Sequence, residues 1–101
     1  MSSSYASIEL VASGRVAHNQ VTHSYKIAQG ASNMLVALLA AELRSDNIRV
    51  ISFDPGHVKT RLGSATAKTE PEQVPEAIVD QAEKNFETGV FLHMKRGKVP
   101  W

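Results

Sequence analysis

The fold is decided by the stretch THSYKIAQGASNMLVALLAAELR, residues 22–44, which has the longest helical period in the chain. Apolar residues recur there at steps of three and four, which is typical of one face of a helix. This stripe consists of Ile27, Ala31, Met34, Leu35, Leu38 and Ala41, and it is widened by Leu39 and Leu43. We predict one long helix, with the Thr22 hydroxyl as N-cap and the cation of Arg44 in the last turn.

Two residues of this helix suggest a neighbouring cleft or a close contact. Gly30 costs about 1 kcal/mol relative to alanine inside a helix, so we expect another backbone, a helix or a ligand to approach it closely. Tyr25 lies in the first turn, where its hydroxyl could face a cleft. The alternative for Tyr25 is a half-buried anchor with its hydroxyl in water.

The segments on either side of the helix predict a small α/β unit. Residues 1–4 are the stub of a strand or a terminus, and residues 5–20 form a long loop with a short helical turn near Ile8 to Val11. Residues 48–53, IRVISF, are a short buried strand, parallel because a helix precedes it closely. Asp54, Pro55 and Gly56 end that strand in a turn, and a loop follows from 57 to 67.

The last third of the chain predicts a second helix and a final strand. Thr69 to Glu72 has the features of a helix start, although Pro75 makes the helix restart there or begin irregularly. Gly89 stops this helix, residues 90–92 form a strand, and residues 95–98 form a turn. We expect Trp101 to pack on the domain.

The resulting order of strand stub, helix, strand, helix and strand indicates the α/β class, with a parallel sheet of about three strands and two main helices. Residues 1–101 form a single unit. Because three strands leave sheet edges to cover and bury little core, the unit is expected to be an incomplete part of a larger fold.

Composition excludes several functional classes. The chain has 101 residues, 43% of them hydrophobic, a net charge of +1 and no cysteine. There is thus no disulfide framework or thiolate chemistry, and no charge excess that favours nucleic acid or an anionic membrane. No apolar run approaches the roughly 18 residues of a membrane span, and no signal peptide is evident. We expect a cytoplasmic location.

Three motifs occur in a fixed order along the chain. Serines follow the strand stub, Tyr25 opens the long helix, and a strand ends in Pro55-Gly56 with Thr60 four residues later. Together these motifs resemble the C-terminal half of the short-chain dehydrogenase/reductase family. The text from Tyr25 to Gly63 is similar to the tyrosine helix, strand and Pro-Gly loop of that family. The ending GVFLHMKRGKVPW resembles its C-factor-like branch. The resemblance implies a partial Rossmann-like sheet.

The resemblance also implies roles for individual residues. Ser3 would hydrogen-bond the substrate carbonyl, with Ser2 as the alternative register. Tyr25 would exchange the carbonyl proton as general acid or base. The loop after the strand would contact the nicotinamide end of NAD(P) through Pro55, Gly56, Val58 and Thr60.

Two departures from the family pattern bear on activity. The lysine expected four residues after Tyr25 is Gln29, which can still hydrogen-bond a ribose but carries no charge, and Lys26 points about 100° away around the helix. An unperturbed tyrosine is only about 0.1% ionised at pH 7. No glycine-rich dinucleotide fingerprint occurs in the sequence, so we expect the N-terminal dinucleotide-binding half to be absent.

Other candidate sites are weaker. The four histidines His18, His23, His57 and His93 have no metal-ligand spacing, and no metal site is predicted. Ser3, His23 and Asp54 could be arranged as a hydrolase triad, but no nucleophile elbow supports one. Basic residues 95, 96 and 98 are predicted to be a solvated turn.

These observations favour an NAD(P)-dependent oxidoreductase acting on a carbonyl/alcohol pair of a small molecule, expected to be inactive as an isolated chain. Its catalytic residues would be Ser3, Tyr25 and Gln29. One alternative is a degenerate half-domain that binds a partner or itself, and another is a proton-transfer isomerase or cyclase on the same scaffold. We expect a homo-oligomer such as a dimer, or a partner that supplies the missing half.

Overall fold

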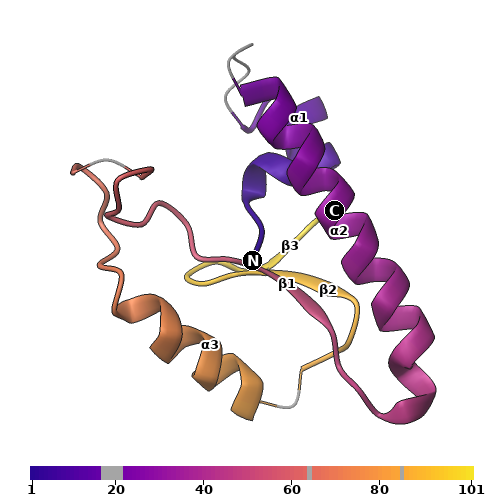
Figure 1. Ribbon diagram of the computed structural model, residues 1–101. Helices are drawn as coiled ribbons and strands as arrows, with labels where there is room; N and C mark the ends of the chain where they lie inside the picture. Colours follow the sequence, from indigo (N-terminus) through magenta and orange to yellow (C-terminus); the bar gives the residue numbers. More distant parts are fainter. Residues whose placement is uncertain (17–21, 64, 85) are drawn as a thin grey trace.

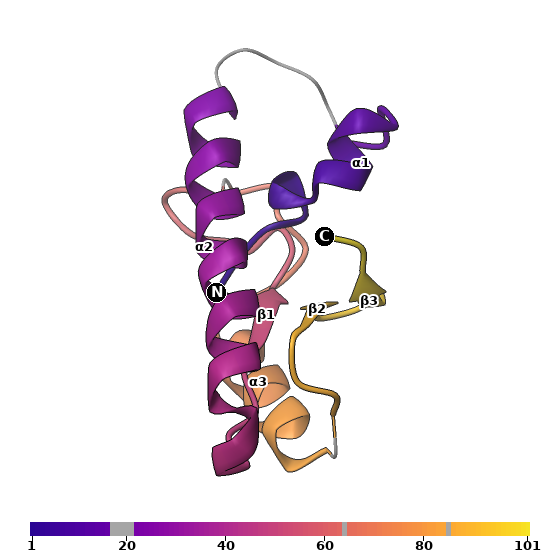
Figure 2. The ribbon, with the colours of Figure 1, turned by 90° about the vertical axis from the view of Figure 1, so that its right-hand side faces the viewer.

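A computed structural model describes residues 1–16, 22–63, 65–84 and 86–101. Within these ranges, helices surround a three-stranded sheet, which confirms the α/β class and the expected three strands with two main helices. The elements are η1 (Ser4–Ala6), α1 (Ile8–Ala12), α2 (His23–Glu42), η3 (Leu43–Asp46), β1 (Ile51–Asp54), α3 (Gln73–Glu83), β2 (Val90–His93) and β3 (Gly97–Val99). The long helix α2 runs along one face of the sheet, and α3 lies on the other side (Figures 1 and 2).

The sheet has the order β1-β2-β3 and is mixed rather than parallel throughout. β1 pairs with β2 in parallel, with Ile51 opposite Val90, as expected for strands joined through a helix. β3 pairs antiparallel with β2 and occupies residues predicted as a turn and tail, because Gly97, with φ 74°, closes a tight hairpin. The predicted strand stub is not a strand, although Ser2 N–H donates to the Phe53 carbonyl at 2.7 Å along the open edge of β1.

Helix α2 packs through its small and polar side chains rather than through its apolar stripe. Its buried residues are Asn33 and Ala40, whereas Ile27 is 73% exposed and Leu38 is 60% exposed. The close approach expected at Gly30 comes from η1, whose Ala6 carbonyl oxygen would lie 4.0 Å from an added Cβ. The small face of α2 therefore fits against the N-terminal turn.

The predicted ends of α2 are partly wrong. Thr22 is the N-cap residue, but its side chain makes no capping hydrogen bond. The chain continues past Arg44 as η3 and turns at Asn47, which adopts the left-handed conformation with φ 57°. Asparagine tolerates that conformation well, so Asn47 ends the helical segment.

Asn33 fastens α2 to the sheet and to the N-terminal segment. Its Oδ1 accepts hydrogen bonds from Ser2 Oγ at 2.7 Å and from Ser52 Oγ on β1 at 2.6 Å. Since Asn33 is only 4% exposed, these buried bonds satisfy its carbonyl oxygen and fix the helix relative to β1.

A small hydrophobic cluster joins α1 to β2 and β3. Leu10 of α1, Phe91 of β2 and Val99 of β3 form it, with Val16 packed against them. As predicted, Trp101 packs on the domain: its ring stacks on Phe91 with centroids 5.6 Å apart. In the segment predicted as a loop, residues 5–20, the short helical turn near Ile8 to Val11 is confirmed as α1, and η1 is a further turn that was not predicted. Residues 17–20 lie outside the described ranges.

Helix α3 begins later than predicted, at Gln73, so Pro75 is its third residue. N–H groups in the first turn of a helix have no acceptor within the helix, so the N–H that Pro75 lacks costs no hydrogen bond. The helix therefore neither restarts nor breaks at Pro75. The helix ends at Glu83 with Lys84 as C-cap, so Gly89 is not its stop and instead leads into β2. No residue of α3 is buried.

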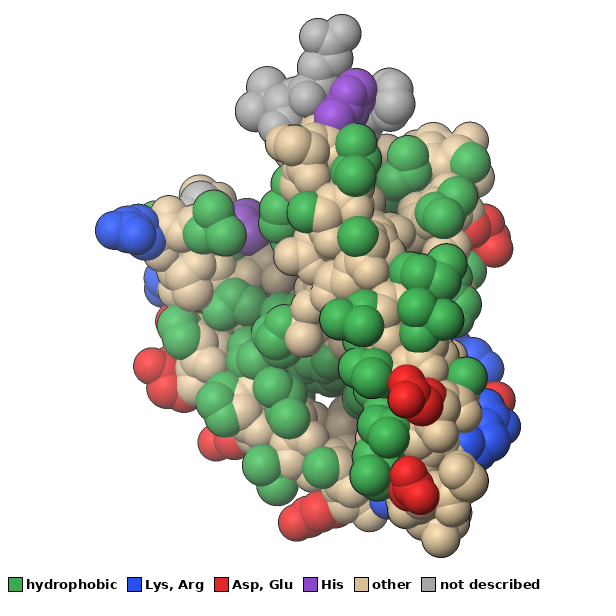
Figure 3. Space-filling view, turned by 45° about the vertical axis from the view of Figure 1, so that its right-hand side comes forward, with side chains coloured by type: hydrophobic (Ala, Val, Ile, Leu, Met, Phe, Trp, Pro, Cys, Tyr) green, Lys and Arg blue, Asp and Glu red, His purple; other side chains and the backbone are tan. Residues whose placement is uncertain are grey.

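Large apolar side chains of both main helices are exposed. They include Ile27, Met34, Leu35 and Leu38 of α2 and Ile78 and Val79 of α3. Figure 3 shows a face of the molecule on which hydrophobic side chains gather around a central hollow. A contiguous apolar surface of this kind is typical of an interaction site.

Candidate active site

A cavity of about 720 Å³ opens at the carboxyl end of β1. It lies among the N-terminal serines, the start of α2 and the loop that follows β1, a loop that projects away from the sheet in Figure 1. All of the predicted site residues line it: Ser3, Tyr25, Gln29, Pro55, Gly56, Val58 and Thr60. The fold thus brings together residues from three separate segments of sequence, while their catalytic roles stay predictions.

The three serines at the start of the chain have different environments. Ser2 is buried and its hydroxyl donates to Asn33. Ser4 is buried and its hydroxyl donates to Asp54 Oδ2. Ser3 is half-buried, and its Oγ accepts a 3.3 Å bond from Tyr5 N–H. Of the three serines, Ser3 alone keeps its hydroxyl proton for another acceptor among the described residues.

Sequence reasoning missed the structural role of Asp54, which connects two walls of the cavity. This residue is 4% exposed. Its Oδ2 accepts from both the backbone N–H (2.6 Å) and the hydroxyl of Ser4, and its Oδ1 accepts from Gly56 N–H at 2.7 Å. One carboxylate therefore holds the serine turn against the Pro-Gly loop. The only signal in the sequence was an aspartate directly before Pro55.

The arrangement differs from the hydrolase triad that the sequence allowed. Asp54 bonds a serine directly, and that serine is Ser4 rather than Ser3. His23 is not among the described residues that line the cavity. Without a histidine between serine and aspartate, no general base is positioned on the serine.

His93 lies beside Asp54 at the end of β2, as its register partner. Its Nδ1 accepts from Lys95 N–H at 3.0 Å and Arg96 N–H at 3.3 Å, so the neutral ring carries its proton on Nε2. An added Cβ on Gly56, which has φ 75°, would lie 3.2 Å from Nε2. Burial lowers the pKa of His93. The negative charge of Asp54 acts to raise this pKa, and the positive charges of Arg96 and Lys95 lower it further.

Tyr25 and Gln29 line the cavity from one face of α2. Tyr25 is 41% exposed, and Gln29 lies one turn further along the helix. Gln29 Oε1 and Asn33 Nδ2 are buried without a hydrogen-bond partner among the described residues. The Gln29 amide thus has unused hydrogen-bonding capacity. Lys26 lies over the ring of Tyr5, 5.4 Å from its centroid, rather than beside Gln29.

The loop after β1 is shaped by its own backbone. Thr60 Oγ1 accepts from Gly63 N–H at 3.0 Å. Any Cβ at Gly63 would lie 1.8 Å from the Val58 carbonyl oxygen, so only glycine fits this turn. Lys59 N–H donates to the Thr69 carbonyl at 2.8 Å. These contacts hold Val58 and Thr60 in the cavity wall.

Two further kinds of function have no support in the described part of the chain. Its histidine, aspartate and glutamate side chains form no group of three or more that could hold a metal ion. None of its helices is long and apolar enough to cross a membrane.

Together the fold and the cavity define a class: part of a Rossmann-like α/β unit with a cavity at the carboxyl end of a parallel strand. Comparison with solved structures then shows which proteins the chain resembles. The carbonyl reductase Sniffer of Drosophila melanogaster matches 100% of this chain with a TM-score of 0.84 and 26% identity, over 39% of its own length. These figures confirm the resemblance to the short-chain dehydrogenase/reductase family.

Two further structures share the fold at lower identity. An NADPH-bound carbonyl reductase from chicken fatty liver matches 99% of the chain and 40% of its own, with a TM-score of 0.77 and 23% identity. A short-chain dehydrogenase/reductase from Burkholderia multivorans with bound NADP matches 100% of the chain and 42% of its own, with a TM-score of 0.75 and 23% identity. The chain thus spans about two fifths of the length of these proteins. No protein-family model and no curated protein matches its sequence.

Proposed function

We propose that the chain is the substrate-side, C-terminal half of an NAD(P)-dependent carbonyl reductase and becomes active when a dinucleotide-binding half completes it. The observation that carries the proposal is the single cavity lined by Ser3, Tyr25, Gln29 and the loop from Pro55 to Thr60. The similarity to Sniffer, a carbonyl reductase, supports the reaction type.

The cavity fits only one end of the cofactor. The residues that would hold the nicotinamide are Pro55, Gly56, Val58 and Thr60, and the side-chain amide of Gln29, which lines the same cavity, would hydrogen-bond a ribose hydroxyl. The sequence has no glycine-rich turn for a pyrophosphate. We therefore expect NADPH to bind the chain by itself no more tightly than the millimolar range, about −4 kcal/mol.

In the proposed reaction the chain's own residues orient the carbonyl and supply a proton. The Ser3 hydroxyl donates a hydrogen bond to the carbonyl oxygen, and the Tyr25 hydroxyl transfers its proton to that oxygen as the alcohol forms. The cofactor supplies the hydride when bound, so a carbonyl, NAD(P)H and one proton give an alcohol and NAD(P)⁺. Asp54 keeps the serine turn and the Pro-Gly loop in register.

A second function, partner binding, is favoured by one observation of its own. The apolar stripe of α2 and the side chains Ile78 and Val79 of α3 are exposed, and the open edge of β1 carries one hydrogen bond from Ser2. A polypeptide that adds strands beside β1 would cover these surfaces. This association is also what the first proposal needs, so the two are compatible.

The test is complementation. The chain is mixed with a separately produced N-terminal half of a carbonyl reductase, and loss of nicotinamide absorbance is followed with a panel of ketones. We expect turnover only in the mixture. Tyr25→Phe or Ser3→Ala should lower this turnover at least about a hundredfold. Ser24→Ala, an exposed serine beside Tyr25, is the matched control. Complex formation by size exclusion without turnover would refute the reductase and leave partner binding.

A further inference from the structure

A second cavity, of about 580 Å³, adjoins the candidate active site. Its described lining residues are Ser4, Tyr5, Leu10, Arg15, Val16 and Arg96. Three of these, Ser4, Tyr5 and Arg96, also line the first cavity. A ligand whose carbonyl lies at Ser3 and Tyr25 can therefore extend past Ser4 into the second cavity.

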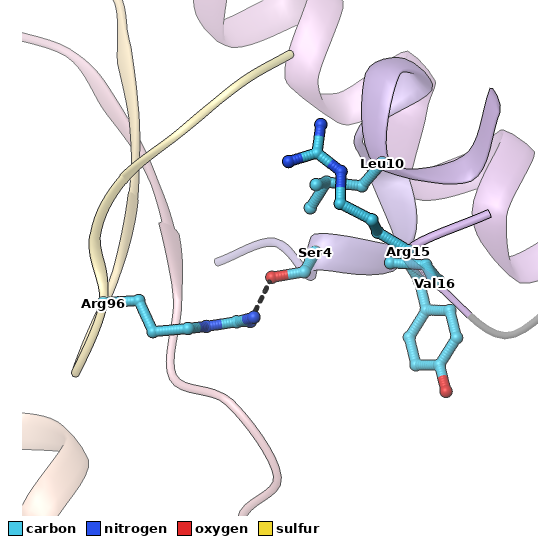
Figure 4. Close-up of a pocket in the computed structure, with 6 residues that line it drawn as sticks. Ser4, Leu10, Arg15, Val16 and Arg96 are labelled. Carbon is cyan, nitrogen blue, oxygen red and sulfur yellow. Dashed lines mark hydrogen bonds between the residues drawn. The ribbon is translucent and has the colours of Figure 1, made fainter. Parts of the chain in front are cut away.

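Arg96 gives this second cavity a cation with unused donors. Its guanidinium reaches in from the β2–β3 turn and donates from Nη2 to Ser4 Oγ at 2.9 Å (Figure 4). Among the described residues it forms no ion pair with a carboxylate, and its side chain makes no other hydrogen bond. Four of its five N–H groups remain for water or a ligand.

The nearest buried carboxylate does not occupy these donors. Asp54 accepts bonds from the Ser4 backbone, the Ser4 hydroxyl and the Gly56 backbone, and none from Arg96 among the described residues. The Ser4 hydroxyl stands between this carboxylate and Arg96. Arg96 therefore faces the cavity as a cation whose partner is a neutral hydroxyl.

The opposite wall of the cavity is partly apolar and carries a second, already paired cation. Arg15, which follows α1, bonds Glu9 at 2.6 Å and Ser13 at 2.9 Å, so its charge is already paired. Leu10 lies beside Arg15 in this wall (Figure 4). An apolar wall opposite Arg96 suits a short alkyl chain that ends in an anion.

We propose that Arg96 binds a carboxylate of the substrate and that the substrate class is an aliphatic oxo acid. This inference rests on the proposed function for the position of the carbonyl, but the carboxylate site depends only on Arg96, Ser4 and the apolar wall. A guanidinium binds a carboxylate through paired, charge-assisted hydrogen bonds, so Arg96 selects anionic over neutral carbonyl compounds.

The experiment is an NMR titration of the full chain with three probes: laevulinate, its neutral methyl ester, and valerate, which has the carboxylate but no ketone. We expect laevulinate and valerate to shift the amide signals of Ser4, Tyr5 and Arg96, and the methyl ester to have at least about tenfold weaker effect. Arg96→Gln should abolish this preference. Lys98→Gln removes the same charge from the same hairpin, where Lys98 pairs with exposed Glu87, and should leave the preference intact.

The two proposals fail in different ways. Equal binding of acid and ester, or a preference that survives Arg96→Gln, would overturn the carboxylate site whether or not the complemented protein is a reductase. If valerate binds at Arg96 but the complemented protein turns over no ketone, only the reductase proposal is refuted. In an active complemented protein, Arg96→Gln should raise KM for laevulinate at least about tenfold with kcat little changed.

Discussion

Gln29 is the residue at which the chain departs most from the family pattern. It lines the cavity one helical turn from Tyr25, but its amide carries no charge, and its Oε1 has no hydrogen-bond partner among the described residues. Gln29 can hold a neutral hydroxyl, yet it cannot stabilise an ionised tyrosine as an ammonium would.

We predict that Gln29→Lys raises carbonyl-reductase turnover in the complemented protein by about tenfold or more, because a cation one turn from Tyr25 favours the phenolate. The measurement is nicotinamide absorbance loss with a fixed ketone. Gln73→Lys, which adds the same charge at the exposed start of α3, is the control.

The gain should depend on the tyrosine. In the double variant Gln29→Lys, Tyr25→Phe we expect no turnover above background. A gain that survives loss of the Tyr25 hydroxyl would show that Tyr25 is not the proton donor.

His93 gives the stability of the chain a pH dependence with a definite sign. Burial lowers its pKa in the folded chain below the ordinary 6.5. As pH falls through 6.5 the unfolded chain takes up this proton first, so the free energy of unfolding decreases until the folded imidazole is protonated as well. Above this range both states are neutral, and His93 contributes no slope.

We predict that His93→Asn removes this component of the pH dependence while keeping an acceptor for the N–H groups of Lys95 and Arg96. Urea unfolding at a series of pH values from neutral to mildly acidic measures it. His57→Asn is the histidine control. An unchanged slope in His93→Asn would contradict the assignment.

At the scale of elements, α2 inverts the usual amphipathic arrangement. Its buried positions hold Asn33 and Ala40, whereas Ile27, Met34, Leu35 and Leu38 are exposed. Small and polar residues let η1 approach Gly30 and let β1 reach Asn33 through Ser52. Hydrogen bonds, more than apolar burial, fix α2 on this sheet.

We predict that Asn33→Ala lowers the free energy of unfolding by about 1–3 kcal/mol, because it leaves the buried hydroxyls of Ser2 and Ser52 without their acceptor. Chemical denaturation followed by circular dichroism measures the change. Ser24→Ala, on the exposed side of the same helix, should change stability by less than about 0.5 kcal/mol. Equal effects of the two substitutions would show that Asn33 does not fasten the helix.

At the scale of the whole molecule, the apolar surface exceeds what the three-stranded sheet can cover. The hydrophobic cluster around Phe91 is small, with Leu10 and Val99 as its other buried members, while Met34, Leu35 and Leu38 are each more than half exposed. Burial of each such side chain in an interface is worth about 1.5–3 kcal/mol, which favours association.

We predict that the chain self-associates through α2 and that the double variant Leu35→Glu, Leu38→Glu weakens this association at least about tenfold. Sedimentation velocity over a dilution series is the measurement. Leu62→Glu, at a side chain that is 92% exposed on the loop after β1, adds the same kind of charge elsewhere and is the control. A compact monomer at all concentrations would contradict this prediction.

Local sequence determined the elements whose signals lie within a few residues. The 3.6-residue period predicted α2, the β-branched run predicted β1, and the order of elements predicted the α/β class. The sequence from Tyr25 to Gly63 also indicated the family that the chain resembles, because the spacing between the tyrosine helix and the Pro-Gly loop can be read directly from the sequence.

Tertiary structure alone decided the face that α2 buries, the mixed sheet and the Asp54 network. The helical period of α2 predicts an apolar stripe, but it does not show whether another surface covers that stripe. The face that α2 does bury contains Asn33, whose partners Ser2 and Ser52 are distant from it in sequence. β3 forms because Gly97 closes a hairpin onto β2. Asp54 and Ser4 are 50 residues apart in sequence, and they come into contact only because β1 places Asp54 beside the N-terminal turn. Contacts over such separations depend on how the elements pack, which local sequence patterns do not encode.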